Sequence, residues 1–373
     1  DNYMDRSAIT PSTMQLNRLK WETTTEYNTG LDASFLKGKL RFTVDVYQKY
    51  IKDLLQKKVK MPTSIGYGNG YEVSYMNSGK MTNKGWEFRV DAVPFENRDW
   101  RVGFYFNIAH NENKITEMPD NYTEENYTFN NGEYAYRREE GRPMGSFYGY
   151  RYKGVCQNKD ATYARDADGN VMKDISGNAI VMRNGTATIA PGDALYEDIN
   201  HDGVINQYDI VYLGNSNPRF TGGAGVNVSY KQFKLSAIFY GRYGQDVVNS
   251  TRLNNESMRG IDNQSTAVLR RWRNEGDQTD IPRALYGEGY NTLGSDRFVE
   301  DASYLRLKSL SFNYRLPKKI IQRWGFSNID VYVTGYNLFT WTKYTGQDPE
   351  VKTENTYARD SATTPASIQL VAG

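Results

Sequence analysis

Hydrophobic and polar residues alternate along several long segments of the chain. In 220–230, for example, Ala224, Val226, Val228 and Tyr230 alternate with glycine, asparagine and serine. Because successive side chains of a strand point to opposite faces, this pattern predicts a strand with one apolar face and one small or polar face. The same alternation recurs in pairs of segments that are joined by short connections. These pairs are 26–35 with 41–47, 86–92 with 100–108, 220–230 with 233–242, and 304–316 with 329–341.

The alternation assigns side chains to two opposite faces. One face carries aliphatic and aromatic side chains, among them Val44, Phe88, Phe104, Val226 and Val331. The other face carries charged side chains, and we expect these to line a wet interior while the apolar ones contact hydrocarbon. The charged residues are Glu26, Asp32, Arg41, Asp45, Glu87, Arg89 and Asp91.

Strand length separates a membrane barrel from a two-sheet sandwich, which would show the same alternation. The predicted strands run about 10 to 16 residues, whereas globular strands average about 5 to 6 and tilted membrane strands need about 9 to 11. Short turns on one side and long loops on the other are typical of outer-membrane barrels. We therefore predict an all-β protein with an antiparallel transmembrane β-barrel. The long loops are 56–78, 115–219, 250–297 and 342–365.

One predicted strand contains an irregularity. In 304–316, Leu305 and Leu307 fall out of phase with the apolar positions that begin at Leu310. An extra residue in one strand of a pair, a β-bulge, produces such a shift. We therefore expect a bulge near Lys308. The alternative is that this end of the strand has left the lipid.

Two short helices are expected in the connections. Between the last two strands, Pro317 suits a helix start and Gly325 a helix end. A second short helix is predicted at 267–274 and is followed by Gly276.

The composition narrows the classes of function. The chain has 373 residues, a formal net charge of +2 and 30 tyrosines. The near-neutral charge gives no attraction to nucleic acid, so we expect no such partner. Apolar runs are shorter than the roughly 18 residues of a membrane helix. A single cysteine excludes an internal disulfide, and no constellation of nucleophile, base and oxyanion donor is evident, so we expect no enzyme activity.

A candidate metal site lies shortly before the strand at 220–230. The sequence D-I-N-H-D-G-V-I-N-Q-Y-D follows the spacing of a calcium loop, D-x-[DN]-x-[DN]-G. Hard cations need several oxygen ligands that converge on one point, and alternate side chains with a glycine turn supply them within a dozen residues. The predicted Ca²⁺ ligands are Asp198, Asn200, Asp202, the carbonyl oxygen of Val204, Asn206 and Asp209.

The alternative for this loop is a solvated turn, shaped by side-chain hydrogen bonds and by Gly203. Position 12 is Asp209 rather than glutamate, and this shorter side chain removes one bidentate contact. If calcium binds, we expect it to stiffen a surface loop rather than to take part in chemistry. No substrate-binding residue is assigned: the aromatic residues of 122–152 could stack on a ligand, but packing within the loop is expected for any one of them.

Five motifs occur in order along nearly the whole chain. They are L-K-W-E-T-T (19–24), Y-E-D-I-N-H-D-G-V-I-N (196–206), L-G-N-S-N-P-R-F-T-G-G (213–223), D-A-S-Y-L-R-L-K-S-L-S-F-N-Y-R-L-P (301–317) and N-L-F-T-W-T-K-Y-T-G-Q-D-P-E-V (337–351). In these motifs the chain resembles the barrel of the SusC/RagA-like TonB-dependent outer-membrane transporters of Bacteroidetes. The insert 158–189 is the part that resembles the family least.

The resemblance implies a barrel of 22 strands with a plugged lumen, of which residues 1–373 form the C-terminal portion. The plug domain and the TonB box are expected outside this chain. The implied location is the outer membrane, in contact with its lipid, and the implied partners are a SusD-like surface lipoprotein and TonB. The implied function is active import of a nutrient, either a glycan (oligosaccharide) or a peptide.

Two alternatives stay open from the sequence. One is a secreted, calcium-stabilised β-protein that binds carbohydrate or belongs to a glycoside hydrolase, although no catalytic carboxylate pair can be nominated. Such a protein would stay soluble in aqueous buffer, whereas a barrel would need detergent. The other is an iron–siderophore receptor of the same barrel class, which the five motifs disfavour.

Overall fold

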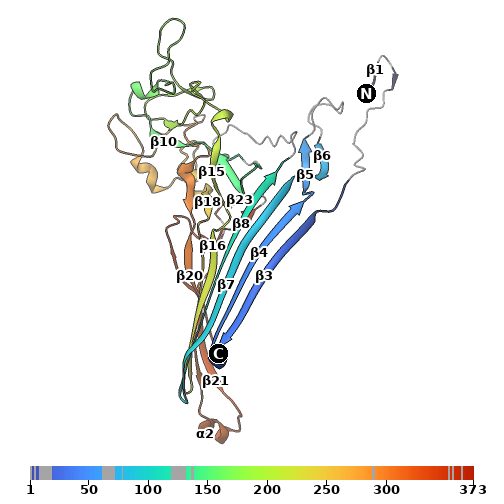
Figure 1. Ribbon diagram of the computed structural model, residues 1–373. Helices are drawn as coiled ribbons and strands as arrows, with labels where there is room; N and C mark the ends of the chain where they lie inside the picture. Colours follow the sequence, from blue (N-terminus) through green and yellow to red (C-terminus); the bar gives the residue numbers. More distant parts are fainter. Residues whose placement is uncertain are drawn as a thin grey trace. The chain divides into compact units, whose positions relative to one another are not determined.

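Long strands form the framework of the chain, as the alternation predicts (Figure 1). The computed structural model describes residues 2–3, 6–7, 19–60, 72–77, 79–118, 132–135, 138–287, 290–351, 353–354, 357–362 and 364–373. The chain divides into two compact units. Unit 1 comprises Asp1–Val90, Ala109–Glu125 and Arg137–Met144, and unit 2 comprises Asp91–Ile108, Asn126–Tyr136 and Gly145–Gly373.

Nine strands share one sheet, in the order β24-β21-β20-β17-β16-β8-β7-β4-β3. Their bounds are β3 Thr23–Phe35, β4 Leu40–Lys52, β7 Lys80–Glu96, β8 Trp100–Glu117, β16 Phe220–Tyr230, β17 Phe233–Tyr243, β20 Tyr304–Arg315, β21 Asp330–Thr342 and β24 Gln369–Ala372. The pairs β3/β4, β16/β17, β17/β20, β20/β21 and β21/β24 are antiparallel. The predicted all-β, antiparallel class is confirmed, and β7 and β8, with 17 and 18 residues, are longer than predicted.

In unit 1, β3 and β4 form a hairpin without a register shift. Its turn is the 3₁₀ helix η1 (Leu36–Gly38), at the place where a short turn is predicted. Gly38 has a φ of 85°, a conformation that glycine adopts without steric cost. After β4, β5 (Leu55–Lys60) and β6 (Glu72–Asn77) pair as a second hairpin. The predicted loop 56–78 therefore contains parts of two strands, while 61–71 and 78 lie outside the described residues.

In unit 2, the expected bulge is present in β20. Ile238 of β17 pairs with Ser309, but the next residue, Phe239, pairs with Leu307, so Lys308 is the extra residue. The ladder between β20 and β21 shifts at the same place. Leu305 and Leu307 consequently return to the face that carries Leu310, and the prediction of a bulge near Lys308 is confirmed.

One of the two predicted helices is confirmed, and the other is confirmed only over its first part. Pro317 precedes α2 (Lys318–Ile321), which continues as the 3₁₀ helix η7 (Gln322–Trp324) and ends at Gly325 in the left-handed region. At 267–274, by contrast, the structure has only the 3₁₀ helix η5 (Thr266–Arg270). The chain leaves the helix because the N–H of Trp272 donates to the carbonyl oxygen of Ile281, 2.9 Å away. Among the described helices, none has the length and apolar character needed to cross a membrane.

The buried core of unit 2 lies outside the long strands, in a set of segments that we call the loop module: the described residues of 145–219, 245–303 and 343–362. Short strands form small separate sheets there, and Phe147, Tyr148 and Phe298 are fully buried. The strands are β9 Ser146–Gly149, β10 Tyr152–Val155, β11 Arg183–Asn184, β12 Ala187–Thr188, β13 Ala194–Tyr196, β14 Val204–Ile205, β15 Val211–Asn215, β18 Asp246–Asn249, β19 Val299–Asp301, β22 Thr353–Glu354 and β23 Tyr357–Asp360. The long connections are therefore folded, hydrogen-bonded structure.

The insert 158–189 contains a short repeat that the sequence did not predict. Asp166 and Asp174 each begin a turn, D-x-x-G-N, and each accepts hydrogen bonds from the backbone two and four residues later. Ala164, Met172 and Ile180 then form a closed ring, in which each N–H donates to the carbonyl oxygen of another member at 2.9 Å. The two eight-residue repeats are thus closed by three backbone hydrogen bonds among Ala164, Met172 and Ile180.

Candidate functional site

The two faces of the long strands differ as predicted. On the apolar face, Val44, Phe104, Val226 and Val331 are exposed, with between 36% and 50% of their surface accessible. Phe88 is half-buried. Large aliphatic and aromatic side chains of a water-soluble protein are usually covered, and exposed sets of this kind mark surfaces that meet an apolar partner or a membrane.

Aromatic side chains gather at both ends of the apolar face in unit 2. At the short-turn end, the ring of Trp100 lies 4.3 Å from that of Tyr230, and Phe233 stacks on Tyr314 at 4.7 Å between centroids. At the long-loop end, Phe220 stacks on Tyr243, and Trp341 stacks on both Phe239 and Phe339. Two aromatic girdles that flank an apolar band are the signature of strands that span a bilayer, because indole and phenol rings prefer the interface. Trp100, which follows the short turn after β7, is part of the girdle at the short-turn end.

The polar face of unit 1 forms a hydrophilic hollow of about 540 Å³. Three of the charged residues predicted for this face, Glu26, Asp45 and Glu87, line it together. Lys49 pairs with Glu26 at 3.3 Å, and the hydroxyl of Tyr47 donates to Asn111 at 3.0 Å. The remaining lining residues are Asn28 and Asn83. A surface so rich in charge and amide groups is built for contact with water or with a polar ligand.

The polar face of unit 2 is similar but less charged. A second hollow of about 340 Å³ is lined by Lys234, Ser236, Ser311, Asn313, Arg315, Asp330 and Tyr332. Ser236 donates to Asn227 at 2.7 Å, and Arg315 pairs with Asp330 at 2.9 Å. Hydroxyl and amide groups thus bond across the strands, which keeps the face polar without leaving groups unsatisfied.

A buried ion cluster fastens part of the loop module to the strands. Arg306 of β20 is almost fully buried, and its guanidinium contacts Asp348 at 2.5 Å and Glu350 at 2.9 Å. Lys308, the bulge residue, also contacts Glu350 at 2.9 Å. The cluster therefore joins the motif 301–317 to the motif 337–351, two stretches quoted above for the family resemblance.

The electrostatics of this cluster favour the charged state of Asp348. Burial alone would raise the pKa of its carboxyl group. Hydrogen bonds from the N–H groups of Ala366 and Glu350 and from Arg306 lower the pKa, and together they outweigh burial. The net result is a pKa below the ordinary value. Asp348 therefore stays ionised and paired at neutral pH.

A second set of buried charges holds the loop module together internally. Glu256 accepts from Arg297 at 2.7 Å and from Arg252 at 3.0 Å, and Arg252 also reaches Glu300 at 3.2 Å. The hydroxyl of Thr345 donates to Glu300 at 2.8 Å. Arg252 and Glu256 are an i,i+4 pair, but the contacts to Arg297, Glu300 and Thr345 join residues 41 to 48 apart in sequence, so no local motif could have identified those.

The acidic loop is a turn whose side chains accept hydrogen bonds from its own backbone. Asp198 accepts from the N–H of Gly203 at 2.8 Å, and Asp202 accepts from that of Val204 at 2.8 Å. Asp209 is buried, and its two oxygens accept from the N–H groups of Ile199 and Asn206, both at 2.8 Å. Burial raises the pKa of the Asp209 carboxyl group despite these hydrogen bonds.

The six predicted calcium ligands therefore lie in one loop, but the side chains also serve the loop's own backbone. Asn206 accepts from Tyr208 and donates to the carbonyl oxygen of Val204 at 3.1 Å, and Asn200 donates to Asp202 at 2.9 Å. Within the described residues, no three acidic, histidine or cysteine side chains come together as a metal-binding group. The set is an oxygen-rich turn that is already closed by hydrogen bonds.

The aromatic residues of 147–152 pack inside the loop module. Phe147, Tyr148 and Tyr150 are buried, and Tyr196 packs edge-on against Tyr150. Packing within the loop, the expected role of these residues, is thereby confirmed for them. Residues 122–131 of the same stretch lie outside the described residues.

Comparisons with known proteins agree with this geometry. The profile of the family described as TonB dependent receptor-like, beta-barrel matches residues 1–338. The TonB-dependent receptor P3 of Formosa agariphila is 32% identical over 349 residues, which cover 91% of this chain and 32% of that protein. SusC of Bacteroides thetaiotaomicron is 27% identical over 90% of this chain and 30% of its own length.

A solved structure gives the same result in three dimensions. The RagAB peptide transporter superposes with a TM-score of 0.67 and 26% identity, over 94% of this chain and 35% of that chain. The chain thus spans about a third of the length of the relatives that it matches. The apolar band, the two girdles, the polar face and these relatives lead to one conclusion: this chain belongs to the SusC/RagA-like TonB-dependent receptors, as part of their outer-membrane β-barrel.

Proposed function

We propose that the protein imports a nutrient across the outer membrane, with energy supplied through TonB and with a SusD-like lipoprotein at the surface. The observation that carries this proposal is the contrast between the exposed apolar face and the hydrophilic hollow of unit 1. A sheet with such faces separates hydrocarbon from a wet passage. The relatives support it, because one is SusC and another is a transporter described as carrying peptides.

The cargo is proposed as an oligosaccharide or a peptide. Both classes present hydroxyl or amide groups, and the hollow of unit 1 offers carboxylates, amides and Lys49 as matching hydrogen-bond partners. The loop module is proposed to meet the lipoprotein, because it is a folded structure at the long-loop end of the strands. The family assignment replaces the secreted carbohydrate-binding protein that the sequence left open.

The test uses the intact protein in its own cell. A tagged copy is purified from outer membranes, and mass spectrometry identifies the co-purifying lipoprotein and any small compound bound between the two. Uptake of that compound is then measured in cells that carry the wild type, Glu87→Ala, or the apolar-face control Val226→Leu. We expect reduced uptake only for Glu87→Ala, and loss of uptake when the proton gradient is dissipated. Unchanged uptake in a strain that lacks the protein would contradict the proposal.

We also propose calcium for the acidic loop, with Asp198, Asn200, Asp202, Val204, Asn206 and Asp209 as ligands. Its support is the all-oxygen donor set, the chemistry that calcium prefers. Each carboxylate oxygen that accepts one backbone hydrogen bond retains a further lone pair for a cation. The ion would stiffen the loop and take no part in transport.

A further inference from the structure

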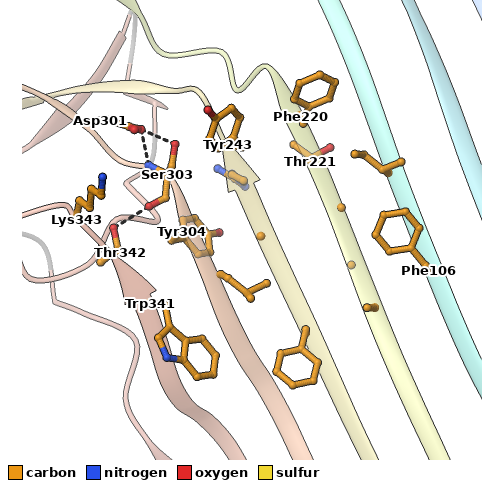
Figure 2. A pocket seen from close by; sticks show the side chains of 18 residues that line it. Phe106, Phe220, Thr221, Tyr243, Asp301, Ser303, Tyr304, Trp341, Thr342 and Lys343 are labelled. Atoms are coloured by element: carbon orange, nitrogen blue, oxygen red, sulfur yellow. Dashed lines mark hydrogen bonds between the residues drawn. The ribbon is translucent and has the colours of Figure 1, made fainter.

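The apolar face of unit 2 is hollowed near its long-loop end (Figure 2). This hollow, which we call the strand groove, has a volume of about 680 Å³. Ligand pockets of proteins span roughly 300 to 1,000 Å³, so the groove is large enough for part of a lipid. It is lined mainly by apolar side chains of β8, β16, β17, β20 and β21.

Paired glycines create the floor of the groove. Gly222 of β16 lies directly opposite Gly241 of β17, so neither strand covers the surface at this level. A side chain could not simply be added there. A Cβ atom at Gly222 would lie 2.5 Å from the carbonyl oxygen of Asn107, and one at Gly241 would lie 2.7 Å from that of Tyr304. The close approach of the strands therefore fixes the hollow.

Aromatic and aliphatic side chains form the walls. Phe106 stands on one flank and Trp341 on the other, while Phe220 and Tyr243 close the long-loop end (Figure 2). Trp341 is 52% exposed and carries an uncovered ring surface. Exposure of such an apolar surface to water is unfavourable, and the ring gains van der Waals contacts when hydrocarbon covers it.

Polar residues gather at one end of the groove. Asp301 accepts hydrogen bonds from the N–H and the hydroxyl of Ser303, and Thr342 donates to the carbonyl oxygen of Ser303 at 2.8 Å (Figure 2). Asp301, Ser303 and Thr342 thus serve as one another's hydrogen-bond partners. Lys343 lies beside them, is exposed, and makes no ion pair or hydrogen bond with any residue that the structure describes. Lys343 is thus a cation with no partner among the described residues, at the end of an apolar groove. The other cation of the lining, Arg242, donates to the hydroxyl of Tyr240 at 3.1 Å.

We propose that the strand groove binds one acyl chain of an outer-leaflet membrane lipid, whose anionic phosphate headgroup lies against Lys343. Three observations lead to this occupant. The groove continues the band of exposed apolar residues that faces the bilayer, it lies at the long-loop end, which is the outer side of such barrels, and its rim supplies a positive charge. Asp301 also lines the groove and keeps its negative charge although Ser303 donates to it. We therefore place the headgroup against Lys343 and away from Asp301. The proposal is independent of the cargo.

The experiment fills the groove and removes the charge separately. Intact protein in detergent is incubated with equal amounts of dioleoylphosphatidylglycerol, which is anionic, and dioleoylphosphatidylcholine, which is zwitterionic, and retained lipids are counted by native mass spectrometry. Ala224→Trp places a large ring in the groove. Val226→Trp, two residues further along the same face, is the matched control outside it. Lys343→Ala removes the charge, and Lys231→Ala removes one charge at the short-turn end.

We expect the wild type to retain one anionic lipid, and Ala224→Trp to lose it while Val226→Trp keeps it. Lys343→Ala is expected to bind both lipids alike, so the wild type's preference for the anionic lipid, about fivefold, is lost. Lys231→Ala should keep the preference. Equal retention by Ala224→Trp and Val226→Trp would refute the groove as a lipid site. So would a result in which Ala224→Trp leaves lipid retention intact and instead disrupts assembly with the lipoprotein or with a second copy.

Discussion

The aromatic residues of unit 2 occupy two regions that treat them in opposite ways. On the long strands, Phe312, Phe339 and Trp341 expose 46% to 61% of their surface. In the loop module, Phe147 and Phe298 expose none. Both regions use the same types of aromatic side chain, so the difference in exposure reflects the solvent that each region meets. Lipid covers the strands, and the loops must cover themselves in water.

This contrast also explains where polar groups are placed. In the loop module, buried charges are paired, as in the contacts of Glu256 with Arg252 and Arg297. On the strands of unit 2, between the two aromatic girdles, charged residues lie on the polar face. A charge on the apolar face could find neither water nor a partner. The comparison can be tested with variants that exchange the two situations.

The largest effect is expected from Phe147→Ala in the loop module. Truncation of a fully buried phenylalanine should destabilise its surroundings by about 3–5 kcal/mol. The matched change on the strands, Phe339→Ala, should cost less than about 1 kcal/mol because lipid tails replace the lost contacts. Hydrogen exchange of 145–150 in the intact protein measures the first cost, and urea titration of folded protein in vesicles measures the second. Equal costs at the two sites would remove the distinction.

A somewhat smaller effect is expected when charge is placed on the two faces of one strand. Val226→Arg should reduce the stability of the folded strands by about 2–4 kcal/mol, because the guanidinium enters hydrocarbon near the middle of the bilayer. Asn227→Arg, on the polar face, should be close to neutral. The yield of folded, heat-modifiable protein in outer membranes reports both. A severe defect in Asn227→Arg alone would reverse our assignment of the faces.

The ion cluster at Arg306 should give the next largest effect. Arg306→Gln removes charged hydrogen bonds to Asp348 and Glu350, at a cost of about 1.5–3 kcal/mol. Protease cleavage within 343–351 should then become faster. Arg306→Lys, which keeps the charge but not the forked geometry, should be intermediate.

Acid should open the same contact. The pKa of Asp348 is lowered from 3.8 in the folded state, so its contribution to stability is complete above that value and is lost as the pH falls through the folded pKa. Cleavage of 343–351 by an acid-stable protease should therefore increase only below about pH 4. In the Arg306→Gln variant, the pKa of Asp348 is lowered less, so the acid-dependent increase in cleavage should be smaller than in the wild type.

The smallest effect concerns the acidic loop. We expect calcium binding in the wild type and an affinity at least roughly tenfold weaker in Asp202→Ala, because a charged ligand is removed. Calorimetric titration of the intact protein with calcium chloride measures both affinities. Equal affinity in the two proteins would show that the loop is held by its hydrogen bonds alone.

The strands could be predicted closely because two solvents dictate their pattern. The expected 220–230 coincides with β16. The expected 304–316 is one residue longer than β20 at its C-terminal end, and the expected 329–341 is shifted by one residue from β21. Even the bulge was readable, since a single shift of phase leaves a visible break in the alternation. Loop residues carry no such pattern, because their partners are distant in sequence.

The candidate sites were predictable to different degrees. The polar-face residues Glu26, Asp45 and Glu87 could be named because alternation fixes which side they occupy. Arg306 could not, because its role depends on Asp348 and Glu350, more than 40 residues away. The helix expected at 267–274 is shorter than predicted for the same reason: it ends at Arg270, because a long-range backbone contact to Ile281 outweighs local helix propensity.

The bulge at Lys308 has a consequence for how β20 can change in length. In a regular strand, the loss of one residue exchanges oil-facing and water-facing positions for everything beyond it. Lys308 is an extra residue, so its removal would not exchange the faces. Leu307 and Ser309 would become neighbours and would still lie on opposite faces of the sheet. Within β20, this is the position where the chain can shorten by one residue without exchanging its faces, at the cost of the contacts of Lys308 with Glu350 and with the ring of Tyr240.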